Sequence, residues 1–437
     1  MKFLQRLFSR LGVALAVLLT ASVMVLPLPV LGLALLAVAL WMALTHSGRQ
    51  ALSVALVGIS TVPQRLGSSA VIVVGIAGVV GVLVALLAMG EGFEATLART
   101  GRADQAIVIR AGATTEINSG LSRDDVTVIT QAQGILRNAE AKPIASPEVV
   151  VVANLPKKAT GTDANVELRG VGERVWELRP EARILDGRQF SPGLRELVVG
   201  KGAREQFAGL DVGATLNLGN QQWTVVGVFS TGDAHDSEVW GDGEVVQGAY
   251  NRSGFQSVTV KLPDADAFDA LKASLTTDPR LNVDVERSRD YYATQSERLA
   301  NLIRILGLTV GGIMAVGAIF GALNTMYAAV STRSREIATL RAIGFSSLPV
   351  VFSVMLESAL LALLGGLIGA GIAWAVFDQY TVSTLGQNFS QVVFAFKVSP
   401  ALILRGLKWA LAIGLVGGLL PAIQAGRLPV TTALRAE

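Results

Sequence analysis

The chain has 437 residues, of which 51% are hydrophobic and only 16% are charged, and its mean hydropathy is +0.50. A chain of this length with these values is too apolar to be soluble, so the composition indicates an integral membrane protein. The formal net charge of +3 is small and the basic residues do not cluster with aromatic ones, so nothing indicates nucleic-acid binding. The absence of cysteine excludes disulfides, thiolate nucleophiles and zinc–thiolate sites.

The first 48 residues contain two short apolar runs, at 11–26 and 30–44, separated by a Pro-Leu-Pro sequence at 27–29. A tight hairpin of two spans with its proline turn near the outer surface places Arg10 and Arg49 on the inner side, where flanking basic residues are retained. A signal peptide is the alternative, and the apolar sequence that continues past the first run disfavours its cleavage. We therefore expect an N-terminal two-span hairpin over residues 1–48.

Residues 49–65 have an apolar stripe that is typical of an amphipathic helix. Leu52, Ala55, Leu56 and Ile59 lie at the i, i+3, i+4 and i+7 positions, and Pro63 ends the pattern. We expect a helix that lies on the inner face of the membrane and interacts with lipid. A simple cytoplasmic linker is the alternative.

Four longer apolar segments form the expected membrane core, at 66–90, 299–330, 347–378 and 401–423. Each exceeds the roughly 20 residues that a helix needs to cross about 30 Å of hydrocarbon. The segments that connect them are an outer domain at 91–298, an inner loop at 331–346, a short outer loop at 379–400 and an inner tail at 424–437. The predicted fold is a polytopic α-helical membrane protein, with a four-span core, an N-terminal hairpin and one large α+β extramembrane domain.

Basic residues near the spans predict which side of the membrane each connecting segment occupies, because they are retained in the cytoplasm. They occur in three segments that the predicted topology places inside: Lys2, Arg6 and Arg10; Arg333, Arg335 and Arg341; and Arg427 and Arg435. Residues 91–298 and 379–400 are then outside. In a Gram-negative cell this arrangement corresponds to an inner-membrane protein with a large periplasmic domain.

The outer domain shows two β-α-β patterns separated by a β-rich stretch. The first consists of a strand at 104–110, a helix that starts at a capping box of Ser122 and Asp125, and a strand at 148–154. The second consists of a strand at 257–262, a helix at 265–275 and a strand at 281–285. We expect the two patterns to pair into a split α/β sandwich, with residues 156–250 as an inserted β-rich subdomain and a hairpin turn at Gly219-Asn220.

Motifs for enzyme chemistry are missing from the sequence. It contains no phosphate-binding loop of the G-x-x-x-x-G-K-[ST] type, no H-E-x-x-H zinc motif and no G-x-S-x-G nucleophile elbow. His235 lies among four acidic residues that could form a weak metal site with it: Asp233, Asp236, Glu238 and Asp242. Such acidic loops are more often solvated, so we expect neither a metal nor a cofactor in this chain.

Within the core spans, Glu357 and several small residues are candidates for helix packing. Glu357 is the only carboxylate well inside a core span, and a lone carboxylate there is more typical of a tie between helices than of a proton relay. The other candidates are Asn324 and the pairs Gly317/Gly321, Gly365/Gly369 and Gly414/Gly418. Glycines at four-residue spacing allow close helix approach, either within one chain or in a dimer, and the sequence favours neither.

Three segments resemble the MacB/FtsX-like permeases of ABC transporters. The most specific is NTMYAAVSTRSREIATLRAIG at 324–344, which is similar to the exit of that family's second span and its coupling segment. Residues 88–93 resemble the end of the first span, and residues 421–435 resemble the C-terminal tail. The resemblance extends from about residue 50 to 437, and the N-terminal hairpin departs from the usual four-span permease.

The resemblance implies a partner ABC ATPase that binds ATP and magnesium, and a second permease copy, most simply in a homodimer. It also implies that residues 333–344 dock against the ATPase. Apolar Ile337 and Leu340 would act as an anchor, and Arg335, Glu336 and Arg341 would offer charges, with Arg333 and Gly344 at the two ends of the segment. Motion driven by ATP would then be transmitted through the second span to the outer domain, which is called mechanotransmission. The chain itself would not be an enzyme.

The expected function is export of a substrate from the periplasm or the outer leaflet of the inner membrane, through a periplasmic adaptor and an outer-membrane duct. Within the family, release of lipoproteins by a LolC/LolE-like permease is an alternative. An FtsX-like regulator of a periplasmic cell-wall hydrolase is another, which the size and two-part design of residues 91–298 disfavour. A membrane enzyme is disfavoured by the missing motifs.

Overall fold

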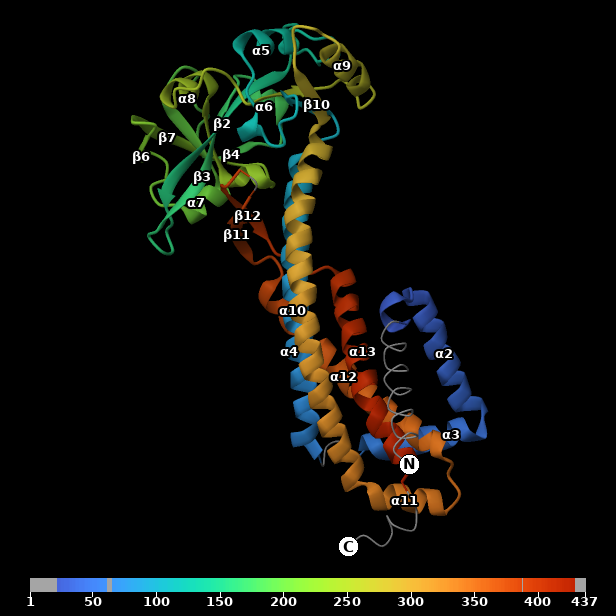
Figure 1. Cartoon of the computed structure of the whole chain (residues 1–437). Helices are drawn as coiled ribbons and strands as arrows, with labels where there is room; N and C mark the ends of the chain where they lie inside the picture. Colours follow the sequence, from blue (N-terminus) through green and yellow to red (C-terminus); the bar gives the residue numbers. More distant parts are fainter. Residues whose placement is uncertain (1–21, 61–64, 387, 429–437) are drawn as a thin grey trace. The chain divides into compact units, whose positions relative to one another are not determined.

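The computed structural model describes residues 22–60, 65–386 and 388–428, and they form two compact units. The helical unit comprises Met1–Met89, Ile303–Asp378 and Lys397–Glu437. The sheet unit comprises Gly90–Leu302 and Gln379–Phe396. Figure 1 shows the elements of both units.

The helical unit contains the expected core spans. Its helices are α2 (Leu28–Leu44), α3 (His46–Ser60), the first part of α4 (Leu66–Thr100), the second part of α10 (Ser288–Thr332), α11 (Ser334–Ala342), α12 (Ser347–Phe377) and α13 (Pro400–Gly426). In the described part of the chain, α4, α10, α12 and α13 are long and apolar enough to cross a membrane, which confirms the predicted four-span core.

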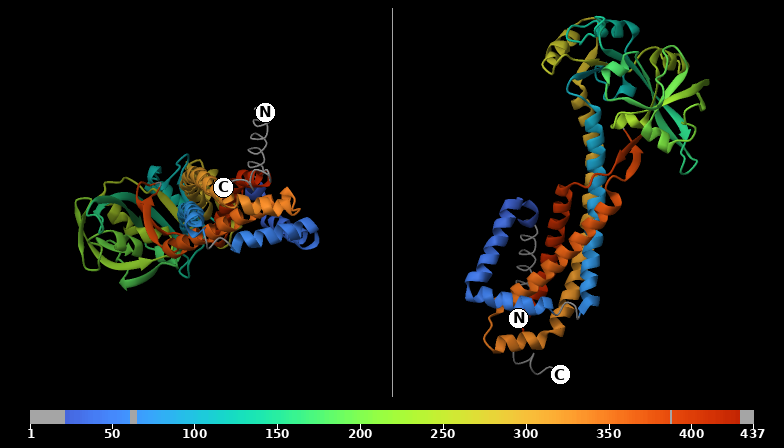
Figure 2. Two further views of the ribbon diagram at one scale, coloured as in Figure 1. Left: turned by 90° about the horizontal axis from the view of Figure 1, so that it is seen from below. Right: turned by 180° about the vertical axis from the view of Figure 1, so that it is seen from behind.

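The N-terminal hairpin is described only in part, because most of the first predicted span lies outside the described residues. Helix α2 and helix α3 meet at an angle of 99° and together could form a fifth span. Their bend is visible in Figure 2. The Lys408 ammonium group on α13 donates a hydrogen bond to the backbone carbonyl of Leu26, 2.7 Å away, and Trp41 on α2 packs edge-on against Phe352 on α12. This segment is therefore attached to α12 and α13.

The amphipathic helix expected after the hairpin is α3, and the two leucines of its predicted apolar stripe face away from the protein, whereas Ala55 of that stripe is buried. Leu52 and Leu56 are 38% and 58% exposed, whereas Ala51 and Gly58 are buried and lie on the side that packs against α12. Small side chains allow two helix backbones to approach closely, so they, and not the leucines, line the contact. The exposed leucines can therefore contact an apolar environment outside the protein.

The sheet unit is built around one mixed sheet. Its strands are β1 (Gln105–Arg110), β2 (Ala145–Pro156), β3 (Asp163–Val171), β4 (Arg183–Gly187), β5 (Glu196–Gly200), β6 (Thr215–Leu218), β7 (Gln221–Ser230), β8 (Glu238–Asp242), β9 (Ser257–Lys261) and β10 (Val283–Arg287). Their order is β10-β1-β9-β2-β3-β8-β5-β7-β4, and β6 pairs with β7. The connecting helices are η2 (Glu116–Asn118), α5 (Arg123–Thr130), α6 (Val175–Leu178), α7 (Lys201–Gln206), η3 (Ala234–Ser237), α8 (Gly243–Ala249) and α9 (Ala267–Thr276).

The two predicted β-α-β patterns interleave in this sheet. The first is β1-α5-β2 and the second is β9-α9-β10, and β1 lies between β10 and β9. The predicted capping box is present, since the backbone N–H of Asp125 donates to Ser122 Oγ (3.1 Å) and that of Ser122 donates to Asp125 Oδ2 (2.8 Å). Gly219 and Asn220, both with positive φ, form the predicted β6–β7 turn.

The β-rich stretch is not a separate subdomain. Strand β2 pairs with β9 over residues 145–148 and then with β3 over residues 149–156. The same strand therefore belongs to both the interleaved part and the inserted part, and strands β3 to β8 extend one continuous sheet. Strand β2 has 12 residues and is long enough to cross both parts. The strand predicted at 148–154 is shorter and contains only one of the four residues that pair with β9.

The segment between α12 and α13 is a β-hairpin that belongs to the sheet unit, not a simple loop. Its strands are β11 (Thr381–Leu385) and β12 (Gln391–Ala395). The backbone N–H of Val393 donates to Ser237 Oγ at 2.7 Å, and the Phe394 and Phe93 rings pack edge-to-face 5.4 Å apart. These contacts hold the hairpin against η3 and against the end of α4.

Candidate functional site: the coupling segment and a buried charge cluster

The predicted coupling segment is a short helix, α11, set between two membrane-spanning helices. Helix α10 ends at Thr332 and α11 begins at Ser334, so Arg333 alone separates them. At the other end, Gly344 has a φ of +106°, a left-handed conformation that glycine adopts without strain. The backbone N–H of Phe345 then bonds to the Leu340 carbonyl at 3.1 Å and closes the helix end.

Two of the residues expected to meet the ATPase face the chain's own interior. Ile337 is only 5% exposed and packs into the helical core, which corrects its expected role as an apolar anchor. The Arg341 guanidinium donates to the Leu428 carbonyl at 2.7 Å, so it holds the segment that follows α13. Ile337 and Arg341 lie four positions apart and therefore share one face of the helix, and this face is turned inward.

The exposed face of α11 contains a residue that the sequence analysis did not select. Arg335 and Glu336 are exposed, Leu340 is half-buried, and Ile343 is 69% exposed. Glu336, Leu340 and Ile343 are at i, i+4 and i+7, so they share one face of the helix. Counting this spacing forward from Glu336 would have identified Ile343.

The glycine pairs divide into two groups. A Cβ atom at Gly365 or Gly369 on α12 would lie 2.6 or 2.3 Å from a carbonyl oxygen of α4, and one at Gly414 or Gly418 on α13 would lie 2.4 or 2.6 Å from side chains of α12. These four glycines therefore serve packing within the chain. In the described part of the chain, a Cβ atom placed at Gly317 or Gly321 has no atom within 4 Å apart from its neighbours in the chain and the adjoining backbone of α10.

Gly317, Gly321 and Asn324 form a stripe on α10, since they lie at i, i+4 and i+7, and the two glycines of this stripe line a groove. The groove has a volume of about 300 Å³ and lies between α10 and α4. Its other lining residues are small or apolar: Val71, Ile72, Gly75, Val79, Met314, Ala318 and Ala322. Gly317 and Gly321 therefore lie on an apolar groove at the surface of the helical unit.

Replacing Gly369 with alanine is expected to destabilise the helical unit, because its Cβ would overlap the Ala77 carbonyl oxygen and push α12 away from α4. Overpacking of this kind typically costs about 1–3 kcal/mol. Gly371→Ala is the matched control, because it makes the same change on the same helix at an exposed position. There an added Cβ atom meets no atom of the described residues within 4 Å apart from its chain neighbours and the adjoining backbone of α12. Thermal unfolding of the detergent-solubilised protein should show a lower midpoint for Gly369→Ala than for Gly371→Ala, and equal midpoints would contradict the packing.

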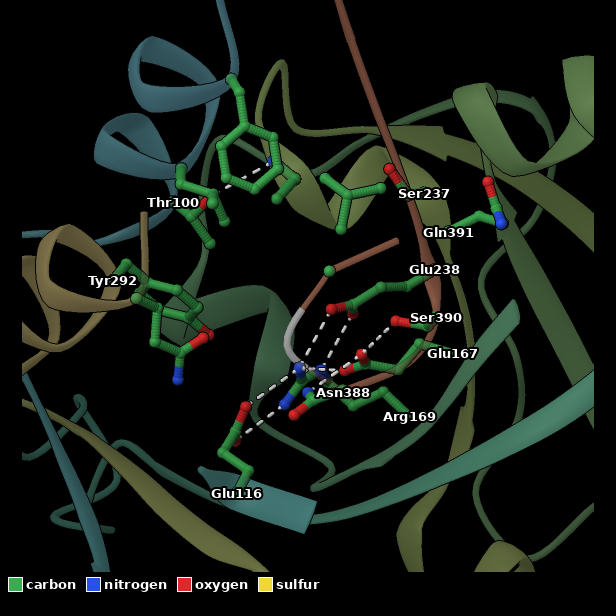
Figure 3. A pocket seen from close by; sticks show the side chains of 16 residues that line it. Thr100, Glu116, Glu167, Arg169, Ser237, Glu238, Tyr292, Asn388, Ser390 and Gln391 are labelled. Atoms are coloured by element: carbon green, nitrogen blue, oxygen red, sulfur yellow. Dashed lines mark hydrogen bonds and ion pairs between the residues drawn. The ribbon is translucent and has the colours of Figure 1, made fainter. Parts of the chain in front are cut away.

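A second group of polar residues lies at the centre of the sheet unit, around the fully buried Arg169 of β3. Its guanidinium donates to Glu116 (2.9 and 3.2 Å), Glu148 (2.8 Å), Glu167 (2.6 Å) and Glu238 (2.9 and 3.0 Å). Figure 3 shows three of these carboxylates converging on Arg169. We call these five residues, with Arg179, the charge cluster.

Sheet register assembles the charge cluster from distant parts of the sequence. Glu167 and Arg169 point to the same face because they are two residues apart in β3, and Glu167 lies opposite Glu238 in the parallel β3–β8 pair. Arg179 follows α6 and donates two hydrogen bonds to Glu148, at 2.7 and 3.2 Å. The sequence alone contains no short spacing that reveals this cluster.

Burial and neighbouring charges shift two carboxyl pKa values in opposite directions. Burial, helped by the adjacent Glu238 carboxylate, raises the pKa of Glu167 to about 7. The Glu148 carboxyl is equally buried, but Arg179 and Arg169 more than offset the burial and lower its pKa to about 2. The cluster thus holds four carboxyl groups against two guanidinium groups, and proton uptake at Glu167 relieves the imbalance.

The charge cluster has little room for a substrate. A cavity of about 50 Å³ lies beside it, lined by Glu116, Glu167, Glu238, Tyr292 and Ser390, among others. This volume fits one or two water molecules. Ser390 Oγ and Asn388 Nδ2 of the β11–β12 hairpin donate to Glu167 Oε2, at 3.1 and 3.2 Å, so the cluster also secures the hairpin.

The residues considered for a weak metal site are dispersed. His235 Nδ1 pairs with Asp233 Oδ1 at 3.0 Å, and both side chains are buried. Asp242 caps α8 by accepting from the backbone N–H of Val245, and Glu238 belongs to the charge cluster. Among the described residues, no group of three or more such side chains is placed to hold a metal ion.

Comparison with known proteins agrees with this architecture. The MacB-like periplasmic core domain model matches residues 69–278, and the FtsX-like permease C-terminal model matches residues 308–430. The macrolide export ATP-binding/permease protein MacB of Pasteurella multocida is 26% identical over 324 residues, which are 67% of this chain and 46% of that protein. The same protein of Neisseria gonorrhoeae is 26% identical over 329 residues, which are 68% of this chain and 48% of that protein.

The chain therefore spans slightly less than half the length of these relatives. The periplasmic region of MacB from Actinobacillus actinomycetemcomitans is a similar solved structure, with a TM-score of 0.35 and 16% identity, covering 45% of this chain and 94% of that one. The first match covers much of α4 and most of the sheet unit, and the second runs from within α10 to the end of α13. This protein belongs to the MacB/FtsX-like family of ABC transporter permeases.

Proposed function

We propose that the chain is the permease subunit of an ABC transporter that transmits the motion of a separate ATPase to its sheet unit. The observation that carries this proposal is α11, a short helix with an exposed face of Glu336, Leu340 and Ile343. Ile343, which is 69% exposed, and half-buried Leu340 place apolar side chains together beside charged ones, and an apolar patch with a polar rim suits a contact surface for another protein. Because α11 lies between α10 and α12, its displacement acts on two spans directly.

The ATPase would hold ATP and magnesium, since no phosphate-binding loop occurs in these 437 residues. Ile343 and Leu340 would fill an apolar depression of the ATPase, and Arg335 and Glu336 would pair with charges at its rim. Arg333, Ile337, Arg341 and Gly344 would act from behind this face by fixing the position of α11. The side of the membrane that carries α11 is then cytoplasmic, in agreement with its basic residues.

A second permease copy would bind at the groove between α4 and α10. The groove is apolar, a Cβ atom at Gly317 or Gly321 would meet open space, and Asn324 follows one turn further along the same face of α10. Close glycine-lined packing supplemented by an amide is a common way for membrane helices to associate. A homodimer is the simplest arrangement, and it places two copies of α11 on a dimeric ATPase.

The sheet unit would lie in the periplasm and the helices in the inner membrane of a Gram-negative cell. Export of a substrate from the periplasm or the outer leaflet then requires a periplasmic adaptor and an outer-membrane duct as further partners. The MacB relatives are named as macrolide exporters, and their name supports an export role for this chain.

Combining Ile343→Asp with Glu336→Lys is expected to weaken ATPase binding strongly, because it places a charge in the apolar contact and reverses a rim charge. Disruption of such a central contact typically weakens binding by about tenfold or more. Tagged protein would be purified from its native cells in mild detergent, and the accompanying ATPase would be quantified by mass spectrometry.

The control combines Leu194→Asp with Glu205→Lys, which makes the same chemical changes at exposed positions of the sheet unit. It should retain as much ATPase as the unaltered protein. Equal recovery of ATPase with both double variants would refute the role of α11, and recovery of no ATPase with the unaltered protein would refute the permease proposal itself.

A further inference from the structure

Glu357 joins three segments of the helical unit that are far apart in the sequence. Its carboxylate accepts hydrogen bonds from Arg333 Nη1 (3.2 Å) and from Arg65 Nη2 (3.1 Å). The Glu357 side chain is only 5% exposed, and those of Arg333 and Arg65 are 11% and 17% exposed. Arg65 directly precedes α4, Glu357 lies on α12, and Arg333 is the residue between α10 and α11.

Arg333 is the point at which the chain changes from α10 to α11. Its backbone has a φ of −104° and a ψ of 9°, outside the helical range, so the direction of α11 depends on this residue. Its Nε atom also donates to Glu336 at 3.2 Å, but the Glu336 side chain is 58% exposed. An exposed pair three residues apart on one helix contributes little, so the buried carboxylate is the firmer of the two contacts.

Helix α3 crosses directly over the same ion pair. A Cβ atom at Gly58 would lie 3.2 Å from both Arg333 Nη1 and Glu357 Oε2. These contacts are tight, so a larger residue at this position would require the guanidinium and the carboxylate to shift by a few tenths of an ångström. The right panel of Figure 2 shows α3 and α11 at the same end of the helical unit.

A buried ion pair is a costly way to pack helices, since apolar side chains of the same volume often stabilise a protein as well or better. Two charged groups can also fix the direction of the helices that they join, because their hydrogen bonds set angles as well as distances. We propose that Glu357 is a positioning residue that holds α11 at a set angle about Arg333 and links it to α3 and to the start of α4. These elements then move together when α11 is displaced.

This inference rests on the proposed function only for the cause of that displacement, and its geometry can be tested without any partner. The chain contains no cysteine, so paired spin labels can be placed on the full-length protein without removing native residues. Ser53→Cys on α3 and Thr339→Cys on α11 are both exposed positions. Electron paramagnetic resonance then gives the distribution of the α3–α11 distance in lipid nanodiscs.

Glu357→Gln should broaden this distribution roughly twofold or more, since an amide offers one acceptor oxygen where two guanidinium groups need one each, and the α11 hinge loses its anchor. Glu336→Gln is the matched control, because it removes the other carboxylate that Arg333 contacts, and it should leave the distribution narrow. A narrow distribution in Glu357→Gln, or equal broadening in both variants, would overturn the proposal.

A second variant covers the case in which Glu357→Gln does not fold. Arg333→Gln removes the hinge side of the pair and leaves Glu357 bound to Arg65, so it should also broaden the distribution, and a narrow one would overturn the proposal. In both variants the exposed face of α11 is intact, so each should still co-purify the ATPase. If the unaltered protein co-purifies no ATPase, this counts against the proposed function but not against the anchoring of α11.

Discussion

Replacing Arg169 with methionine is expected to destabilise the sheet unit more than any exposed substitution described above. Methionine fills much of the volume but leaves Glu116, Glu148, Glu167 and Glu238 without their shared cation. Breaking a buried ion pair by removing one partner typically costs about 3–5 kcal/mol, because the remaining charge stays buried. Here several carboxylates lose a partner at once, and the expected loss is at the upper end of that range.

The measurement is denaturant unfolding of the full-length protein in detergent, followed by hydrogen exchange of peptides from β2, β3 and β8. Arg188→Met is the control, since Arg188 pairs with Glu196 but its side chain is 55% exposed. Exposed pairs contribute about 0–1 kcal/mol, so this variant should unfold almost as the unaltered protein does. Similar losses of protection in both variants would show that the charge cluster does not hold the sheet together.

The sheet unit is also expected to lose stability as the pH rises from about 4.5 to about 7. The pKa of Glu167 is raised from 4.5 to about 7, so in this range the folded protein keeps a proton that the unfolded chain releases. Stability from this group is fully present below pH 4.5 and is lost as the pH passes through 7. A difference of this size corresponds to about 3 kcal/mol.

Glu167→Gln should remove this loss, because the amide resembles the protonated carboxyl and does not titrate. Hydrogen exchange of β3 peptides at several pH values between 4.5 and 7 gives the slope of stability against pH. Glu140→Gln, at an exposed position paired with Lys142, is the control and should show the same slope as the unaltered protein. An unchanged slope in Glu167→Gln would assign the pH response to another group. Below pH 4.5 the sign reverses, since the pKa of Glu148 is lowered and its protonation at about pH 2 removes stability.

The parts of the fold that depend on local sequence were predictable. The four spans follow from length and hydropathy, and β1, α5 and the β6–β7 turn follow from alternation, a capping box and a Gly-Asn pair. The charge cluster was not predictable, because Arg169 meets Glu116, Glu148 and Glu238 only through the register of neighbouring strands. Each of these glutamates, taken alone, reads as an ordinary polar position.

The surroundings of each face of α3 and α11 were likewise not predictable from the local sequence. From the sequence, the apolar stripe of α3 was expected to meet lipid, and Ile337 and Leu340 were expected to anchor α11 on a partner. In the structure, Ala51 and Gly58 make the α3 contact, and Ile337 faces inward while Ile343 is exposed. Periodicity identifies the faces of a helix, but it does not tell which face meets the protein and which meets lipid or a partner, since all three surroundings accept apolar side chains.

The β11–β12 hairpin has a consequence for building chimeric permeases. The polypeptide passes between the two units four times, at residues 89–90, 302–303, 378–379 and 396–397, because the sheet unit consists of two separate stretches of chain. A transplant of residues 90–302 alone would leave behind Asn388 and Ser390, which bind Glu167, and Val393, which binds Ser237. Exchange of this unit between relatives therefore requires both stretches from the same donor.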